Sequence, residues 1–73
     1  MASKVGKVIE FDGYTGEIVD KEKKYIFLDQ DILDNVENND IVVFQGEKVG
    51  DINRAFLVRK LTPKDKKVKS TKN

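Results

Sequence analysis

The sequence contains no cysteine, no histidine and no tryptophan, and it has a single proline among its 73 residues. Without cysteine the chain can form neither a disulfide nor a thiolate metal site. Without histidine it lacks the commonest general base and metal ligand, and it cannot pair a nucleophile with histidine. So short a chain also has little interior in which to isolate two catalytic carboxylates from water. We therefore predict that the protein is not an enzyme and that it holds no metal and no other cofactor.

Long apolar segments are also absent. No run approaches the roughly 20 residues that a membrane helix needs, and the first seven residues, MASKVGK, contain no apolar stretch of the signal-peptide type. The length leaves room for one domain. We therefore expect a single cytoplasmic domain with no membrane contact, present as a monomer.

Charge is divided unevenly along the chain. Residues 62–73 hold five lysines against one aspartate, whereas residues 1–61 hold 9 basic and 12 acidic side chains. A mildly acidic body is not typical of a protein that binds double-stranded DNA. Because Pro63 ends regular structure, we predict a folded domain at 1–61 and a disordered lysine-rich tail at 62–73. That tail either adds non-specific affinity for nucleic acid or only keeps the protein soluble.

Five short apolar segments predict strands, at residues 5–11, 17–19, 24–28, 41–44 and 54–61. Residues 12–16 and 20–23 are typical of turns, and residues 46–53 predict a flexible glycine loop. The acidic segment 29–39 is expected to form one helical turn that closes a barrel end, and it lacks the spacing of a calcium loop. This order indicates an all-β, five-stranded Greek-key barrel of the OB type, with an SH3-like barrel as the alternative. The expected core residues are aliphatic and aromatic: Val8, Ile18, Val42, Phe44, Phe56, Val58 and Leu61.

Several short motifs along residues 6–61 resemble those of the cold-shock domain family. Gly6-Lys7-Val8 with Phe11-Asp12 is similar to the family's opening Gly-Lys-Val-x-x-Phe-Asn. The run from Gly13 to Ile18 resembles its Gly-Phe-Gly-Phe-Ile segment, stretched by one residue. Val42-x-Phe44 and Ala55-x-x-Val58-x-x-Leu61 resemble its later strands. The resemblance implies a five-stranded barrel that binds single-stranded RNA or DNA by stacking bases on aromatic side chains of strands two and three.

The sequence departs from that family where the bases would stack. The family's tryptophan position corresponds to Glu10, its second aromatic of strand two to Glu17, and its third strand ends here in Leu28-Asp29. Carboxylates at these positions would repel phosphate. This weakens the expectation for the function more than the expectation for the fold.

The side chains of the third strand that point outward decide between two functions. Alternate side chains of a strand point to opposite faces, so either Tyr25 and Phe27 or Ile26 and Leu28 point outward. Because aliphatic residues prefer the core, we favour outward Tyr25 and Phe27, which gives weak, low-specificity binding of single-stranded nucleic acid, RNA in particular. The residues expected to contact it are Lys7, Phe11, Tyr14, Tyr25, Phe27 and Arg54. Outward Ile26 and Leu28 would instead favour a module that binds a protein and has lost nucleic-acid binding.

Overall fold

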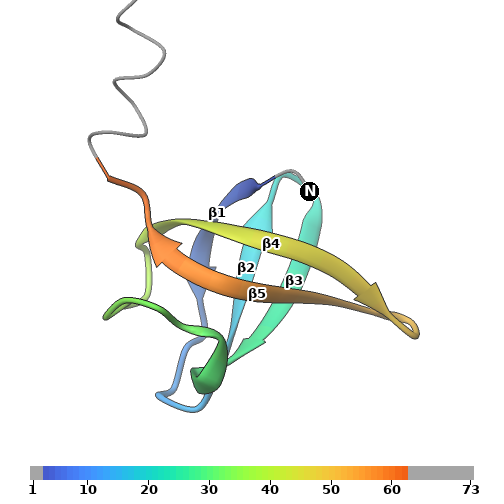
Figure 1. The fold of residues 1–73 in the computed structure, drawn as a ribbon, viewed down its shortest axis with the longest axis horizontal. Coiled ribbons are helices and arrows are strands. Elements are labelled where there is room, and N and C mark those ends of the chain that lie inside the picture. The colour runs from blue at the N-terminus through green and yellow to red at the C-terminus, as the bar shows by residue number, and fades with distance from the viewer. Residues whose placement is uncertain (1–2, 63–73) are drawn as a thin grey trace, which may run out of the picture.

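The computed structural model describes residues 3–62, and these residues form a small barrel of five strands (Figure 1). The elements are β1 (Lys4–Ile9), β2 (Thr15–Asp20), β3 (Lys23–Leu28), the short 3-10 helix η1 (Asp29–Asp31), β4 (Ile41–Val49) and β5 (Ile52–Lys60). The predicted tail at 62–73 lies, from residue 63 on, outside the described residues. Within the described part, no helix is long and apolar enough to cross a membrane.

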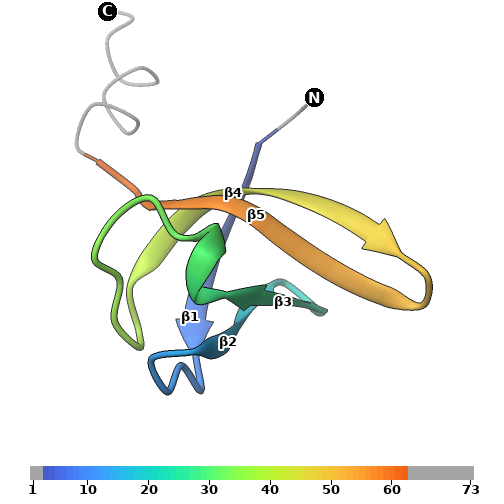
Figure 2. The ribbon, with the colours of Figure 1, turned by 60° about the horizontal axis from the view of Figure 1, so that its bottom comes forward.

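The strands close on one another in the order β1-β2-β3-β5-β4. Consecutive strands from β1 to β3 pair antiparallel, and β4 pairs antiparallel with both β1 and β5. The ring is completed by a parallel contact between β3 and β5, at Ile26 and Arg54. In Figure 2 the loop that follows β3 and the helix η1 lie across one end of the barrel. This topology confirms the predicted five-stranded Greek-key barrel of the OB type.

The core follows the alternation of inward and outward side chains along each strand. Four of the predicted aliphatic core residues are fully buried, Val8, Ile18, Val42 and Val58, and Phe44 is buried with them. Two predictions for the core were wrong, because Leu61 and Phe56 are only half-buried. Leu61 follows the last strand, and its backbone N–H donates a hydrogen bond to the carbonyl of Ile41, the first residue of β4. Phe56 lies on the outside of β5, beneath the guanidinium of Arg54.

The segment 46–53 is not the flexible loop that its glycines predict. β4 continues to Val49 and β5 begins at Ile52, so only Gly50 and Asp51 lie between the strands. Gly50 has a φ of 64°, the conformation that two-residue hairpin turns require. The pair of strands therefore extends beyond the barrel as an arm, which Figure 1 shows clearly.

The connection between β3 and β4 closes one end of the barrel, as predicted, but its helical turn comes earlier than expected. The turn is Asp29–Asp31, and Ile32, which follows it, is extended and forms a parallel bridge with Val58. Val36 is buried in the core, while Leu33 remains largely exposed. The apolar residues of this connection therefore close the barrel from a loop rather than from a helix.

Candidate interaction face

The outside of β1, β2 and β3 forms one continuous surface, which we call the outer face. Residues directly opposite each other on paired strands share a face, and the pairs Ile9–Glu17 and Glu17–Ile26 define its central row. Most other members are aliphatic or basic; the full set is Lys7, Ile9, Thr15, Glu17, Val19, Lys24, Ile26 and Leu28. Four aliphatic side chains, two lysines and a threonine therefore surround a single carboxylate in the central row.

Tyr25 and Phe27 point into the core, so the prediction that these two side chains of the third strand point outward was wrong. Their side chains are 4% and 0% exposed, while Ile26 is 38% exposed. Phe27 lies opposite Gly16, where a Cβ atom would come within 2.7 Å of the Phe27 ring. A similar Cβ on Gly46 would come within 2.7 Å of Tyr25. Small residues leave space for large rings inside a narrow barrel, and this volume effect outweighs the preference of aliphatic residues for the core.

The other predicted binding residues differ in how accessible they are. Lys7 is exposed on the outer face, between Val19 and Ile41. Among residues 3–62, Tyr14 is the most exposed large hydrophobic residue, at 74%. Phe11 is half-buried, and its ring lies 5.2 Å from the ring of Phe27 in a tilted contact. Lys7 and Tyr14 are therefore available to a partner, whereas much of the Phe11 surface already covers the core.

Arg54 is held by the protein itself, which the sequence analysis did not foresee. Its Nη2 atom donates a hydrogen bond of 2.8 Å to the Asp31 carboxylate, and its Nε donates to the Ile26 carbonyl at 3.3 Å. The same guanidinium lies 4.7 Å from the centre of the Phe56 ring. Asp31 also accepts the backbone N–H of Leu28 at 2.8 Å. Arg54 thus joins β3, β5 and η1, and it is not free to contact a base.

The loops at the end of the barrel nearest Tyr14 are acidic and closely joined. Asn38 accepts a hydrogen bond from the backbone of Phe11 and donates one back, which ties the β1–β2 loop to the β3–β4 loop. The backbone N–H groups of Thr15 and Tyr14 both donate to Asp12 and hold the pKa of that carboxyl below its ordinary value. Residues 10–15 and 29–40 contain seven carboxylates and no lysine or arginine. This end therefore opposes the approach of phosphate groups.

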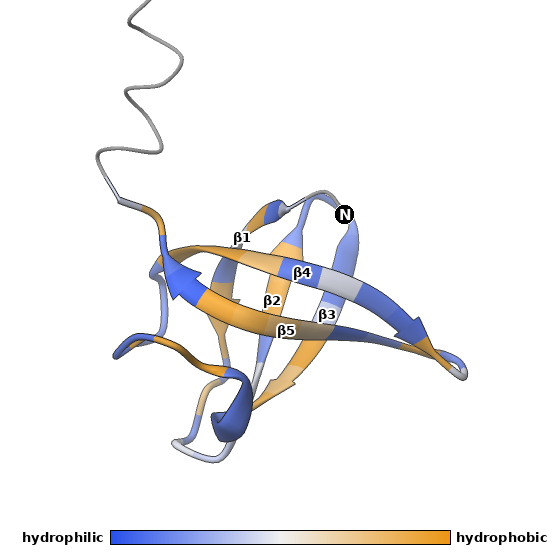
Figure 3. Ribbon diagram, viewed as in Figure 1, coloured by the Kyte–Doolittle hydropathy of each residue, from blue (hydrophilic) through white to orange (hydrophobic). Residues whose placement is uncertain are grey.

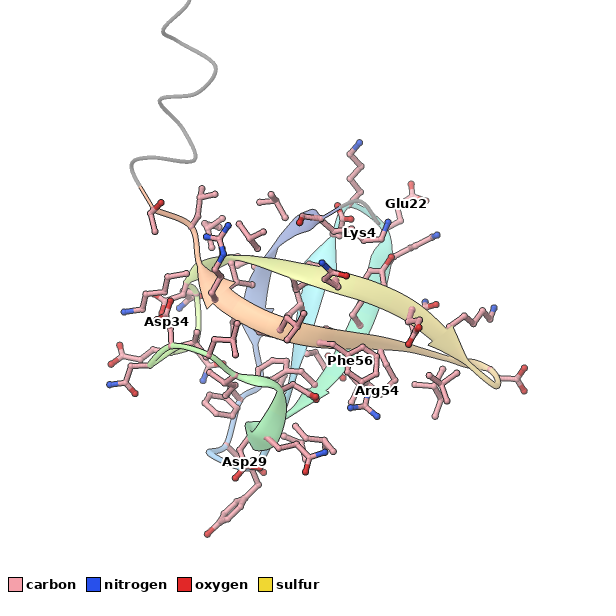
Figure 4. The ribbon with its side chains drawn as sticks, viewed as in Figure 1. Lys4, Glu22, Asp29, Asp34, Arg54 and Phe56 are labelled. Carbon is pink, nitrogen blue, oxygen red and sulfur yellow. The ribbon has the colours of Figure 1, made fainter. Side chains whose placement is uncertain are left out.

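The opposite end of the barrel carries mixed charge. A hollow of about 380 Å³ lies there, lined by Lys4, Asp20, Lys21, Glu22, Lys23 and Tyr25. Figure 4 shows Lys4 and Glu22 at this end, and Asp29 at the other. Among residues 3–62, no group of acidic side chains is arranged to hold a metal ion. The hollow opens widely to solvent and contains no set of groups that converge on one point.

Comparison with known structures supports the fold. A solved structure described as Drosophila Unr CSD456 superimposes with a TM-score of 0.73 and 18% sequence identity, over 85% of this chain. The chain has the fold of a cold-shock domain. The match spans 28% of the Unr chain. No protein-family model matches the sequence, and a search of curated proteins also found no match.

Within the cold-shock fold, the outer face stands where the sequence resemblance places the base-stacking aromatics. The positions on β2 and β3 are occupied here by Thr15, Glu17, Ile26 and Leu28, and no aromatic side chain points outward from either strand. Glu17 is half-buried and lies 3.9 Å from the Lys24 ammonium. The outer face of β2 and β3 therefore presents aliphatic and polar side chains and no aromatic ring.

Proposed function

We propose that this cold-shock-type barrel is a protein-interaction module, and that its partner binds the outer face of β1, β2 and β3. The observation that carries the proposal is the exposure of Ile26 in place of the aromatic pair, since Tyr25 and Phe27 are buried. Aliphatic side chains bind by burying apolar area, which a protein partner can match. They offer a base no ring to stack on, and stacking supplies about 1–3 kcal/mol per base.

Crosslinking from the outer face tests this function. A photoreactive group is placed at Ile26, or for comparison at Val49 on the tip of the arm, and crosslinked products in cells are identified by mass spectrometry. We expect one protein to crosslink from Ile26 and not from Val49, and Glu17→Lys to reduce its yield because the new charge lies in the centre of the face. Equal products from both sites, or a yield that Glu17→Lys leaves unchanged, would contradict the proposal.

Binding of single-stranded nucleic acid is the second candidate, supported by the cold-shock fold and by two lysines on the outer face. Lys7 and Lys24 are both exposed, and the exposed Tyr14 directly precedes β2. With Arg54 paired and the aromatics buried, such binding would be weak, of low specificity and strongly dependent on salt. RNA and the cytoplasm remain the expected partner and location for this candidate.

A titration with labelled oligo-U and oligo-dT separates the two candidates. The protein-interaction proposal predicts no saturable binding at low salt. The nucleic-acid candidate predicts binding that Lys7→Glu weakens and that Glu17→Phe strengthens, because phenylalanine removes a negative charge and adds a ring. Saturable binding with this response to both variants would favour the second candidate and count against the first.

A further inference from the structure

Tyr25 is a buried tyrosine whose hydroxyl group has no partner within residues 3–62. The side chain is 4% exposed, and its ring packs edge-on against the ring of Phe44, with the ring centres 5.0 Å apart. Buried tyrosine hydroxyls usually find a hydrogen-bond partner. Every fully buried side-chain polar atom of residues 3–62 does have one, so the unpaired Tyr25 oxygen reaches the surface. The hydroxyl can therefore donate a hydrogen bond to a ligand.

Tyr25 lines a second hollow besides the one described above. This smaller hollow, of about 220 Å³, lies between the mixed-charge end of the barrel and the arm, and its other lining residues are Lys4, Lys23, Gly46, Glu47, Lys48 and Asn53. Gly46 makes room for it, because a Cβ atom there would lie 2.7 Å from Tyr25 Cε2 and 2.9 Å from Lys4 Cε. The Tyr25 ring and the end of the Lys4 side chain therefore meet over Gly46.

Three lysines of the smaller hollow occupy positions that continue the inward rows of their strands. Lys4 lies opposite the buried Phe44. Lys23 precedes Tyr25 by two residues, and Lys48 follows Phe44 by four, so both share the face of those core residues. Figure 3 shows β3 and β4 hydrophobic within the barrel and mainly hydrophilic toward this end. The alternation of the strands therefore directs three ammonium groups to the space beside Tyr25.

The positive charge of the smaller hollow is not neutralised by neighbouring carboxylates. Within residues 3–62 none of its three lysines forms an ion pair. Glu47 is the one acid among its lining residues, and alternation places its side chain on the opposite face of the arm from Lys48. Asp20 and Glu22 line only the larger hollow. The smaller hollow therefore attracts an anion, in contrast to the acidic end of the barrel near Tyr14.

We propose that the smaller hollow binds a phosphate group, with the Lys4, Lys23 and Lys48 ammonium groups and the Tyr25 hydroxyl as its donors. A phosphate group carries about −1.5 to −2 charge near neutral pH and offers several strong acceptor oxygens, and lysine binds it as a point charge. Inorganic phosphate and a phosphate monoester share this chemistry. The site lies at the mouth of the barrel, so it is separate from the outer face and does not depend on the proposed function.

Titration of the ¹⁵N-labelled full chain, followed by NMR at constant ionic strength, tests the site. The probes are inorganic phosphate and uridine monophosphate, with sodium chloride as the control. Because the lysines are partly or largely exposed, we expect saturable shifts of the Tyr25 and Gly46 backbone N–H signals with a Kd of about 1–10 mM. Tighter binding of the monoester would identify a carried phosphate as the ligand, and equal or weaker binding would identify the free ion.

Two variants and a matched control locate the binding. Tyr25→Phe should weaken it about threefold to tenfold and leave the urea midpoint unchanged, because the hydroxyl has no partner to lose within residues 3–62. Lys48→Gln should weaken it about twofold to fivefold. Lys7→Gln, which removes an exposed lysine from the outer face, should have no effect.

Three results would overturn the proposal. The first is a wild type that shows no saturable shift with either probe up to about 20 mM, or shifts that sodium chloride reproduces. The second is an affinity that Tyr25→Phe leaves unchanged. The third is a loss of affinity in Lys7→Gln as large as that in Lys48→Gln, since this would mean that phosphate binds any surface lysine.

Discussion

The ion pair between Asp31 and Arg54 allows a quantitative test of how the barrel end is held. Replacing Asp31 with alanine removes the acceptor for two donors, Arg54 Nη2 and the backbone N–H of Leu28, each at 2.8 Å. An unsatisfied N–H costs about 1 kcal/mol, and breaking a buried ion pair costs about 3–5 kcal/mol. The Arg54 side chain is 21% exposed and can turn toward water, which reduces the second cost. We therefore expect Asp31→Ala to lower the free energy of unfolding by about 2–4 kcal/mol.

The measurement is urea denaturation followed by far-UV circular dichroism. Because a small domain has a total stability of only about 5–15 kcal/mol, Asp31→Asn serves as a milder variant. Its amide oxygen can still accept the Leu28 N–H, so its loss of stability should lie between those of the wild type and Asp31→Ala. Combining Asp31→Asn with Arg54→Met in a double-mutant cycle should give a coupling energy of about 1–3 kcal/mol.

The pair formed by Glu17 and Lys24 is the matched control. The Lys24 Nζ and Glu17 Oε1 atoms are 3.9 Å apart, and the Glu17 and Lys24 side chains are 35% and 64% exposed. A double-mutant cycle with glutamine at both positions should therefore give a coupling energy of less than about 0.5 kcal/mol. The reasoning fails if the coupling between Asp31 and Arg54 is as small as that of this control. It also fails if Asp31→Ala unfolds at the same urea concentration as the wild type.

Four further substitutions test the packing of the barrel and one of its turns by the same denaturation measurement. Gly16→Ala should destabilise it by about 1–3 kcal/mol, because the new Cβ would lie 2.7 Å from the Phe27 ring; a neutral result would show that the ring can move aside. Val58→Ala should cost about 2 kcal/mol and Val5→Ala less than about 1, since Val58 is fully buried and Val5 is half exposed; equal costs would contradict the assigned directions. Lys21→Gly should stabilise the barrel by about 1 kcal/mol, because Lys21 is exposed at a φ of 60°, and a loss of stability would refute this account of the turn.

The fold could be predicted because its signals are local and repeated. Val8, Ile18, Val42 and Val58 are apolar residues within short β-branched segments separated by turn residues, and such a pattern specifies the number of strands and most of the core. The arm could not be predicted in the same way. Glycines in 46–53 are typical of a loop, but here Gly46 lies beside Tyr25, where a side chain would not fit, and Gly50 forms the turn.

The candidate site was harder to predict because its residues depend on distant partners. Arg54 was expected to contact nucleic acid, but Asp31, 23 positions away in the chain, pairs with it. The prediction for Arg54 considered its own segment and the resemblance, and neither contains this carboxylate. In the sequence, the local signal of the pair is an aspartate that comes shortly after a strand and directly before an apolar residue, and such a pattern is too common to be specific.

The interior of this barrel determines the chemistry of its exterior. Because Gly16 must lie opposite Phe27, the next pair along β2 and β3 must be Glu17 and Ile26, and this pair has to point outward. If the β2–β3 hairpin shifted as a unit by one residue against β1 and β5, the aromatic rings would become exposed, but the Glu17 carboxylate would be buried without a partner, at a cost of several kcal/mol. The packing of the rings and the exclusion of the carboxylate therefore favour the same register. While Phe27 remains in the core, the outer face can therefore offer rings for base stacking only through new aromatic residues at positions such as Glu17 and Ile26.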